Sequence, residues 1–203
     1  SITITADQNI SIDFVLAESS EQLQEVEITG RKERTYKNTS SFSGTKTETP
    51  LKLVPQAISY VTKEVIDDQQ AFKTSDVLKN LSGVNVFSFY NNDFSLRGFR
   101  AGNALINGLR DPTNSWGQSL LPNVERVEVI KGPASALFAN SDPGGTVNTV
   151  TKKPLNESRK AISFATGSYN TFRITGDFTG PMDEEKTLLY RMNVAYQNAQ
   201  SFR

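Results

Sequence analysis

The sequence contains no cysteine and no histidine among its 203 residues. Without cysteine the chain can form no disulfide, no zinc–thiolate site and no thiol nucleophile. Without histidine it also lacks the most common general base and the most common transition-metal ligand. These two absences weigh against most enzyme classes. We therefore expect a protein that is not an enzyme and that has no metal site and no intrinsic cofactor.

An excess of charge of one sign is also absent, because 22 Lys and Arg residues balance 22 Asp and Glu residues. A nucleic-acid-binding protein draws much of its affinity from Lys and Arg on phosphates, so no nucleic-acid partner is expected. Long hydrophobic runs are missing as well, since no apolar run exceeds four residues. A membrane-spanning helix needs roughly 20.

The first 49 residues divide into two regions of different composition. Residues 1–17 alternate apolar and polar residues, which predicts the last strands of a small β domain. Residues 18–49 hold few large apolar side chains, so they cannot bury enough surface to offset the entropy of ordering. We predict a flexible linker there, with one β-prone stretch, LQEVEITG, at residues 23–30.

Residues 50–154 predict a small α+β domain, because short strand and helix patterns alternate irregularly. Helices are expected at 63–69, capped by Thr62, at 75–81, capped by Thr74 or Ser75, and at 134–139 after Pro133. Asn107-Gly108 predicts a hairpin turn. The expected strands cover residues 57–62, 84–87, 94–99, 104–107, 124–132 and 144–153.

After residue 154 the apolar pattern has a strict period of two. Apolar residues alternate with polar ones in three stretches, AISFATGS, TFRITGDFTG and LLYRMNVAYQNA. Strands of membrane barrels show this alternation, with the apolar side facing lipid. An antiparallel sheet with one hydrated face shows it too, and periodicity alone favours that simpler interpretation. Three strands are too few to close a barrel.

Four segments between residues 50 and 154 resemble the plug domain of TonB-dependent outer-membrane receptors, in the ferric-siderophore branch. They are VPQAISYVTKEVIDDQ (54–69), FSLRGF (94–99), LPNVERVEVIKGPASALF (121–138) and SDPGGTVNTVTKKP (141–154). The resemblance implies a plug at residues 50–154, a small mixed sheet with short helices. It also implies that residues 155–203 are about the first three strands of a 22-stranded antiparallel transmembrane β-barrel. Residues 1–17 resemble the end of a carboxypeptidase-regulatory-like β-sandwich domain of Bacteroidota receptors.

The function that this resemblance implies is binding of a ferric siderophore and its import across the outer membrane. The energy would come from the partner protein TonB, with the plug and the N-terminal segment facing the periplasm and the strands facing outer-membrane lipid. LQEVEITG resembles a TonB box, an extended stretch that adds a strand to TonB through main-chain hydrogen bonds. The alternative is a merely β-prone piece of linker. The expected TonB-binding residues are Glu25, Val26, Glu27, Ile28, Thr29 and Gly30.

Two cations, Arg97 and Lys131, are expected on largely buried strands, where an unpaired charge would cost several kcal/mol. The resemblance implies that such plug residues pair with acidic groups of the barrel wall and latch the plug. Alternatively, Glu125 and Glu128 pair locally with Arg126 and Lys131. The family more often has arginine at the position of Lys131, and lysine cannot form a bidentate pair there.

Ligand contacts are expected on the apical loops of the plug, at residues 87–93 and 110–118 and in the turn after residue 99. Aromatic and amide groups suit a bulky chelate, and an arginine suits an anionic one. Alternatively, the aromatic rings pack beneath barrel loops. The candidate ligand-binding residues are Phe89, Tyr90, Asn91, Arg100, Arg110, Asn114 and Trp116.

Three other functions are compatible with parts of the sequence. The chain could belong to an importer of another nutrient, cobalamin or a glycan. The glycan branch typically has different sequences where this chain has KGPAS and DPGGTVN. The chain could also be an isolated periplasmic plug-type interaction module, whose sheet would need no lipid. An enzyme is the least supported class.

Overall fold

The structure is a computed structural model that describes residues 36–41, 45–47, 49–88, 91, 93–101, 104–111, 117–132 and 142–200. The predictions for residues 1–17, for the TonB box and for a helix at 134–139 lie outside these residues. None of the helices in the described ranges has the length and apolar character needed to cross a membrane.

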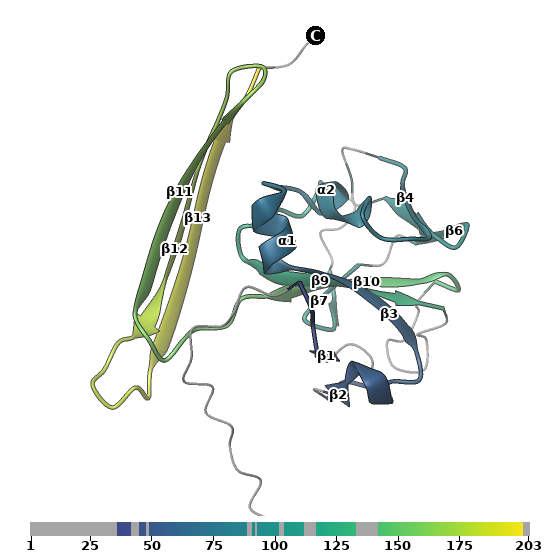
Figure 1. The fold of residues 1–203 in the computed structure, drawn as a ribbon, viewed down its shortest axis with the longest axis horizontal. Coiled ribbons are helices and arrows are strands. Elements are labelled where there is room, and N and C mark those ends of the chain that lie inside the picture. The colour runs from purple at the N-terminus through teal and green to yellow at the C-terminus, as the bar shows by residue number, and fades with distance from the viewer. Residues whose placement is uncertain are drawn as a thin grey trace, which may run out of the picture. The chain divides into compact units, whose positions relative to one another are not determined.

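A five-stranded mixed sheet forms the centre of the first part of the structure (Figure 1). Its strands pair antiparallel except β10 and β7, which are parallel. The mixed sheet with short helices is therefore confirmed. In spatial order, the strands are β3 (Ala57–Thr62), β9 (Val124–Lys131), β10 (Gly145–Thr151), β7 (Ala104–Ile106) and β8 (Leu109–Arg110).

The main hydrophobic core lies where α1 (Lys63–Asp68), α2 (Thr74–Leu78) and a second small sheet pack on one face of the five-stranded sheet (Figure 1). The small sheet consists of β4 (Val84–Val86), β5 (Phe94–Leu96) and β6 (Phe99–Ala101). The side chains that fill this core include Val61, Ile66, Val77, Leu78, Phe94, Leu96, Val127, Val129 and Val147. Leu105 and Ile130 form a second, smaller cluster.

The chain enters this domain through three short elements. They are β1 (Ser40–Ser41), β2 (Thr49–Pro50) and the 3-10 helix η1 (Leu51–Leu53). β1 and β2 pair with each other antiparallel. Ser41 is buried, so the chain is held against the domain before the first strand of the central sheet begins.

The structure corrects the strand predicted at residues 94–99. The backbone instead forms β5, a turn at Arg97 and Gly98, and β6, which pairs back on β5. Both turn residues have positive φ, 52° for Arg97 and 86° for Gly98. Glycine adopts this conformation easily, whereas arginine does so rarely. The arginine therefore gives no sequence signal for the turn.

The cap predicted for α2 is also wrong. Neither Thr74 nor Ser75 caps the helix, because the N-cap position belongs to Lys73. The carboxylate of Asp76 accepts hydrogen bonds from the main-chain N–H groups of Phe72 (3.0 Å) and Lys73 (2.9 Å). An acidic side chain at the third helical position can reach back in this way. Thr62 does occupy the N-cap position of α1, as predicted, but makes no cap bond to the described residues.

Two glycines at the start of β10 permit a close backbone approach. A Cβ atom on Gly144 would lie 2.1 Å from the main-chain oxygen of Leu96. A Cβ atom on Gly145 would lie 2.0 Å from that of Ile130. Side chains cannot fit at these distances, so the close approach of the backbone requires glycine at both positions.

The last described segment is a three-stranded antiparallel sheet of β11 (Arg159–Gly167), β12 (Thr171–Pro181) and β13 (Leu189–Asn198). Three residues, 168–170, connect β11 to β12, and two of them, Tyr169 and Asn170, have positive φ. All three predicted strands are confirmed. The cross-strand register places Phe164, Ile174 and Tyr196 side by side on one face.

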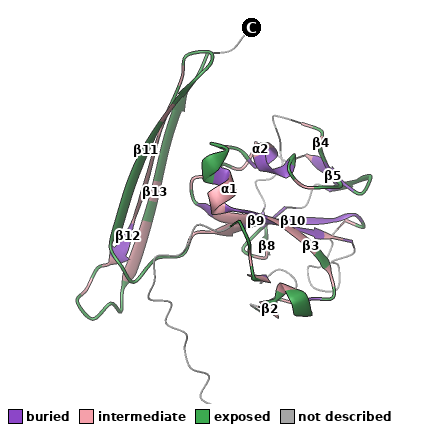
Figure 2. Ribbon diagram, viewed as in Figure 1, coloured by how far each residue is buried: buried purple, intermediate pink, exposed green. Residues whose placement is uncertain are grey.

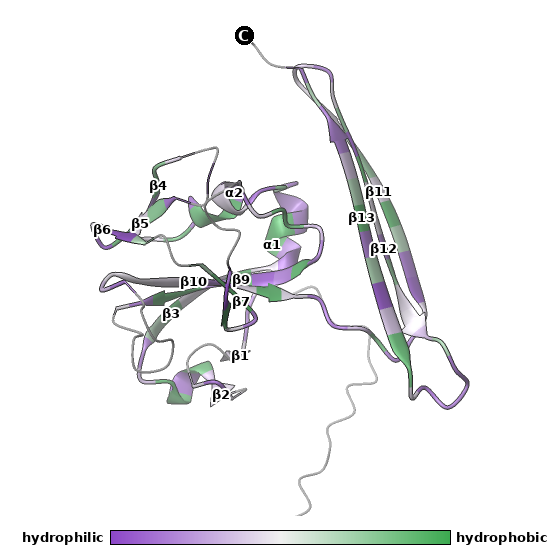
Figure 3. Ribbon diagram, turned by 180° about the vertical axis from the view of Figure 1, so that it is seen from behind, coloured by the Kyte–Doolittle hydropathy of each residue, from purple (hydrophilic) through white to green (hydrophobic). Residues whose placement is uncertain are grey.

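The two faces of this sheet differ in polarity. Hydrophobic and hydrophilic residues alternate along the strands in Figure 3, and most of β11 and β13 is exposed in Figure 2. The exposed apolar residues are Ile162, Phe164, Phe172, Met192, Val194 and Tyr196. The opposite face carries the rows Ala161–Asp177–Asn193 and Arg159–Thr179–Arg191.

Candidate functional site

The loop between β4 and β5 is closed by its own backbone. The main-chain oxygen of Asp93 accepts hydrogen bonds from the N–H groups of Phe87 (2.9 Å) and Ser88 (3.3 Å). The N–H of Asn91 donates to the Ser88 hydroxyl (3.2 Å). The pairing of β4 with β5 thus extends into the loop that the sequence assigns to ligand contact.

The structure brings the described ends of two predicted ligand loops together. The side-chain amide of Gln118 donates to the main-chain oxygen of Ser88 (3.1 Å). The hydroxyl of Ser75, near the start of α2, donates to the Gln118 amide oxygen (2.7 Å). Gln118 therefore connects the loop after β4 both to the segment before β9 and to a helix packed on the core.

An ion pair holds Arg100 of β6 against the same loop. Its Nε and Nη2 atoms donate to the two carboxylate oxygens of Asp93, at 2.9 and 2.6 Å. The Asp93 hydrogen bonds raise the pKa of the Arg100 guanidinium. Because Arg100 is already paired within the chain, it does not present an isolated positive charge.

The other candidate ligand residues fall into two groups. Asn91 and Arg110 are exposed, Asn91 in the loop before β5 and Arg110 at the end of β8. The remaining candidates lie outside the described residues, and they are Phe89, Tyr90, Asn114 and Trp116. Two exposed aromatic rings of this region, Phe87 and Phe99, escaped the sequence-based selection. Their positions could have suggested them, because Phe87 begins the predicted ligand loop at residues 87–93 and Phe99 directly precedes Arg100.

The local alternative for the acidic and basic residues of β9 is confirmed in part. Glu128 is fully buried, and its Oε1 accepts a hydrogen bond from Nε of Arg126 (2.6 Å). Its other oxygen, Oε2, accepts a bond from the hydroxyl of Ser41 in β1 (2.9 Å). Glu128 thus satisfies both carboxylate oxygens inside the domain and fastens the incoming chain to the central sheet. Glu125, on the same strand, is half-buried.

The strand position predicted for Arg97 needs correction, whereas Lys131 lies on a strand as predicted. Arg97 lies in the turn between β5 and β6 and is exposed, because the chain reverses there. Lys131 does end β9, but it is half-buried and donates to the hydroxyl of Ser82 (3.1 Å) rather than to a glutamate. A latch between these residues and a barrel wall stays a prediction.

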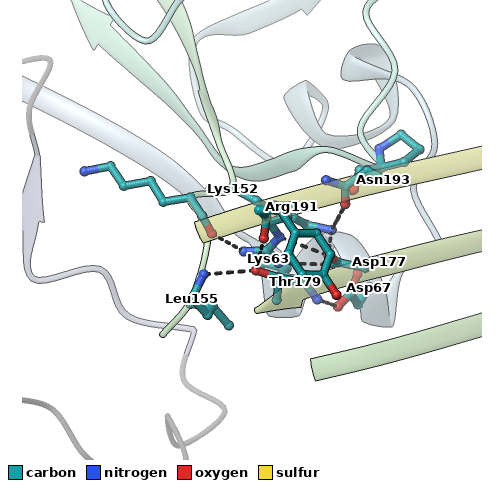
Figure 4. A network of polar contacts seen from close by, with 11 residues as sticks. Lys63, Asp67, Lys152, Leu155, Asp177, Thr179, Arg191 and Asn193 are labelled. Atoms are coloured by element: carbon teal, nitrogen blue, oxygen red, sulfur yellow. Dashed lines mark hydrogen bonds and ion pairs between the residues drawn. The ribbon is translucent and has the colours of Figure 1, made fainter. Parts of the chain in front are cut away.

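A polar network that the sequence did not predict joins the segment after β10 to β12 and β13 (Figure 4). The ammonium of Lys152 donates to Oδ2 of Asp177 (3.0 Å) and to the main-chain oxygen of Pro122 (2.6 Å). Arg191 binds the same carboxylate through Nε (2.9 Å) and Nη2 (2.7 Å). Its Nη1 donates to the main-chain oxygen of Lys153 (2.6 Å).

Because this network is buried, its charged groups lose more hydration than those of a surface ion pair, and each needs a partner. The side chains of Lys152 and Arg191 are each only 8% exposed. Desolvation lowers the pKa of the Lys152 ammonium, and its bond to Asp177 opposes that shift. One carboxylate compensates two buried cations. Thr179 adds a second connection, because its hydroxyl accepts a bond from the N–H of Leu155 (3.0 Å).

A separate contact ties β12 to the loop between α1 and α2. Nη2 of Arg173 donates to the main-chain oxygen of Gln70 (2.8 Å). The guanidinium carbon of Arg173 also lies 4.9 Å from the centroid of the Phe72 ring, a cation–π geometry. The polar face of the β11–β13 sheet therefore contacts the preceding domain at two places. The signal in the sequence was the set of charged residues at alternate positions of β12 and β13.

No group of three or more acidic, histidine or cysteine side chains that could hold a metal ion occurs among the described residues. The ion pairs and hydrogen bonds of Lys152, Asp177, Arg191 and Arg173 hold the β11–β13 sheet to the preceding domain.

Comparison with known families gives one match within the chain. Residues 50–146 match the family described as TonB-dependent Receptor Plug Domain. This range includes most of the five-stranded sheet, both helices and the small β4–β6 sheet.

Individual relatives extend the similarity beyond this range. The chain is 36% identical over 199 residues to the metal-pseudopaline receptor of Pseudomonas aeruginosa strain UCBPP-PA14, covering 92% of the chain and 28% of that receptor. It is 34% identical to the ferrichrome outer membrane transporter/phage receptor of Escherichia coli K12, covering 75% of the chain and 22% of the transporter. The chain thus spans about a quarter of the length of these relatives.

A solved structure shows the same fold. The pyoverdine outer membrane receptor from P. aeruginosa PAO1, bound to pyoverdine, is similar with a TM-score of 0.77 and 28% identity. The similarity covers 82% of the chain and 26% of the receptor.

Proposed function

Because the chain belongs to the TonB-dependent receptor family, whose plug domain it carries, we propose that it forms the plug-bearing part of an outer-membrane importer. The imported ligand is a ferric siderophore, and TonB delivers the energy for its passage. The relatives named as receptors or transporters of ferrichrome and pyoverdine support this assignment of ligand class. The chelate crosses intact, so the protein needs no catalytic residue.

The two faces of the β11–β13 sheet carry this proposal most directly. The polar face contacts the plug through Lys152, Asp177 and Arg173, while the apolar face is exposed. A transmembrane barrel has this polarity, with polar residues inside and apolar residues toward lipid. The strands are 9, 11 and 10 residues long, close to the roughly 9–11 that cross a bilayer. We propose that residues 155–203 begin a 22-stranded barrel.

The segment before the plug takes the role of the coupling element in this proposal. In it, Glu25 to Gly30 form the TonB box, and residues 18–49 form a flexible linker that lets the box reach TonB. Residues 1–17 end a preceding β domain. The bond between Ser41 and Glu128 supports the coupling, because it connects the chain that follows the box to a central strand of the plug. A pull on the box would reach β9 through this buried contact.

The ligand-binding end is assigned to the surface formed by the β4–β5 loop, β6 and the segment at Gln118. The hydrogen bonds that join these segments support a common surface for Asn91 and Arg100. The plug–barrel contact is assigned to Lys152, Asp177 and Arg191, with Arg97, Glu125 and Lys131 as further predicted members.

Radio-iron uptake by iron-starved cells tests the proposal. Cells carrying the full-length receptor are compared with cells whose receptor lacks Val26 to Gly30, over a panel of ferric siderophores. We expect uptake of at least one chelate, abolished by the deletion, with surface binding retained. Uptake of cobalamin or a glycan in place of every ferric chelate would refute the ligand class. A receptor that is extracted without detergent would instead favour a soluble plug-type interaction module.

A further inference from the structure

The ion pair between Asp93 and Arg100 has an asymmetric exposure. The Arg100 side chain is 75% exposed, whereas the Asp93 side chain is only 19% exposed. Both carboxylate oxygens of Asp93 are occupied by the guanidinium. A molecule that approaches this surface therefore meets the guanidinium first, with a compensating negative charge directly behind it.

The pair leaves hydrogen-bond donors available without leaving net charge. A guanidinium carries five N–H donors, and the Asp93 contacts use the one on Nε and one on Nη2. The three remaining donors are engaged by no other described residue. Arg100 is protonated, as a guanidinium always is in proteins, and its bonds to Asp93 raise its pKa further. The surface can thus donate to oxygen acceptors while its electrostatic attraction for anions is weakened.

An exposed aromatic ring lies on the same face of the small sheet as this pair. The N–H of Phe87 donates to the main-chain oxygen of Asp93, and the β4–β5 register, continued by one residue, sets Phe87 opposite Asp93. Arg100 pairs with Ser95, which shares the face of Asp93 because side chains alternate along a strand. The Phe87 ring is exposed. An apolar ring beside uncharged donor capacity suits a ligand with low net charge and oxygen atoms on its surface.

We propose that Asp93 is a specificity-determining residue of the ligand surface. By neutralising Arg100, it favours ferric chelates of low net charge with exposed oxygen acceptors over strongly anionic ferric chelates. This inference rests on the proposed function, because it concerns the chelate that the receptor imports. Without Asp93, Arg100 would be an uncompensated cation and would attract anionic chelates.

The test is the affinity of the full-length receptor for two probes, a neutral ferric trihydroxamate and a trianionic ferric tricatecholate. The Asp93→Asn variant keeps the size of the side chain but removes its charge. We expect it to bind the tricatecholate about fivefold more tightly, because the exposed cation is no longer compensated. Binding of the trihydroxamate should change by less than about twofold. The gain for the tricatecholate should shrink at high salt.

Two further variants separate specificity from a general loosening of the loop. Arg100→Gln in the Asp93→Asn background should abolish the gain for the tricatecholate, because the attracting cation is gone. Asp67→Asn removes another exposed, paired carboxylate of the plug, on α1, and should change neither affinity. A gain that survives removal of Arg100 would overturn the inference.

The inference and the proposed function fail in different ways. If the unsubstituted receptor binds a ferric chelate and Asp93→Asn leaves the ratio of the two affinities unchanged, the inference is wrong and the proposed function stands. If the unsubstituted receptor binds no ferric chelate but takes up another nutrient, the proposed ligand class is wrong, and the inference fails with it.

Discussion

The plug sheet and the β11–β13 sheet place their large apolar side chains in opposite surroundings. Val127 and Val129 of β9 are fully buried beneath the helices and the small sheet of the plug. Phe164 of β11 and Val194 of β13, in strands just as rich in apolar residues, are 67% and 51% exposed. The difference lies in what covers each face. The plug supplies its own cover, whereas the β11–β13 sheet has cover within the described chain only on its polar face.

The plug core should therefore respond most strongly to loss of apolar volume. Leu96→Ala removes a fully buried side chain, and we expect the free energy of unfolding to fall by about 4 kcal/mol. Leu109→Ala makes the same chemical change at a side chain that is 75% exposed. It should alter the free energy of unfolding by less than about 0.5 kcal/mol. Urea unfolding measures both values. Equal losses would mean that the two leucines do not differ in burial.

The contact between the two sheets should show the next largest effect. Asp177→Asn removes the charge that compensates Lys152 and Arg191, so two buried cations lose their partner. Breaking a buried pair costs about 3–5 kcal/mol, and partial exposure of Asp177 reduces the expectation to about 2 kcal/mol. The matched control is Asp67→Asn on α1, whose carboxylate is 52% exposed beside Lys63, so the cost should be below about 0.5 kcal/mol. A loss at Asp177 no larger than at Asp67 would show that the network does not join the sheets.

A smaller, pH-dependent effect should come from Lys152 alone. Burial lowers its pKa below 10.5 in the folded chain, so the unfolded chain binds this proton more tightly. Stability rises with pH wherever the unfolded state holds more protons. The free energy of unfolding of the unsubstituted chain should therefore increase relative to that of Lys152→Met as pH rises toward 10.5. A difference that is constant with pH, or that falls, would contradict a desolvated ammonium.

The exposed apolar face should show the smallest effect in water. Ile162→Ser and Val194→Ser replace exposed side chains, and each should change the free energy of unfolding of this chain by less than about 0.5 kcal/mol. Circular dichroism during urea titration can follow the unfolding. A loss above about 1.5 kcal/mol would mean that the chain itself covers this face, and the contrast with the plug would disappear.

Much of the fold could be predicted because local patterns decide it. The bounds of β3 matched the prediction at residues 57–62, and the Asn107-Gly108 turn formed with both residues at positive φ. The prediction failed where a residue acts against its usual preference. Arg97 adopts a conformation that arginine rarely takes. The N-cap position of α2 belongs to Lys73, whose N–H donates to Asp76, whereas Thr74 or Ser75 was expected to cap the helix.

The candidate site was harder to predict, because its contacts join residues far apart in the chain. Lys152 and Asp177 are separated by 25 residues, and Arg173 and Gln70 by 103. Periodicity identified the polar face of β12 but could not indicate which residue of another element would meet it. The resemblance to a family predicted a plug–barrel latch at Arg97 and Lys131. The observed ion pairs instead join Lys152, after β10, to Asp177 on β12 and Asp177 to Arg191 on β13.

The hydrogen-bond acceptors of the network formed by Lys152, Asp177 and Arg191 have a consequence for its evolution. Lys152 and Arg191 each donate one bond to a main-chain oxygen, at Pro122 and Lys153. Any amino acid offers the same carbonyl, so positions 122 and 153 can drift without breaking these bonds. Substitutions there would leave no correlated change at 152 or 191. Covariation between homologous sequences would consequently detect this network only through its side-chain partners, Asp177 and Asn193, and would underestimate how firmly the sheets are joined.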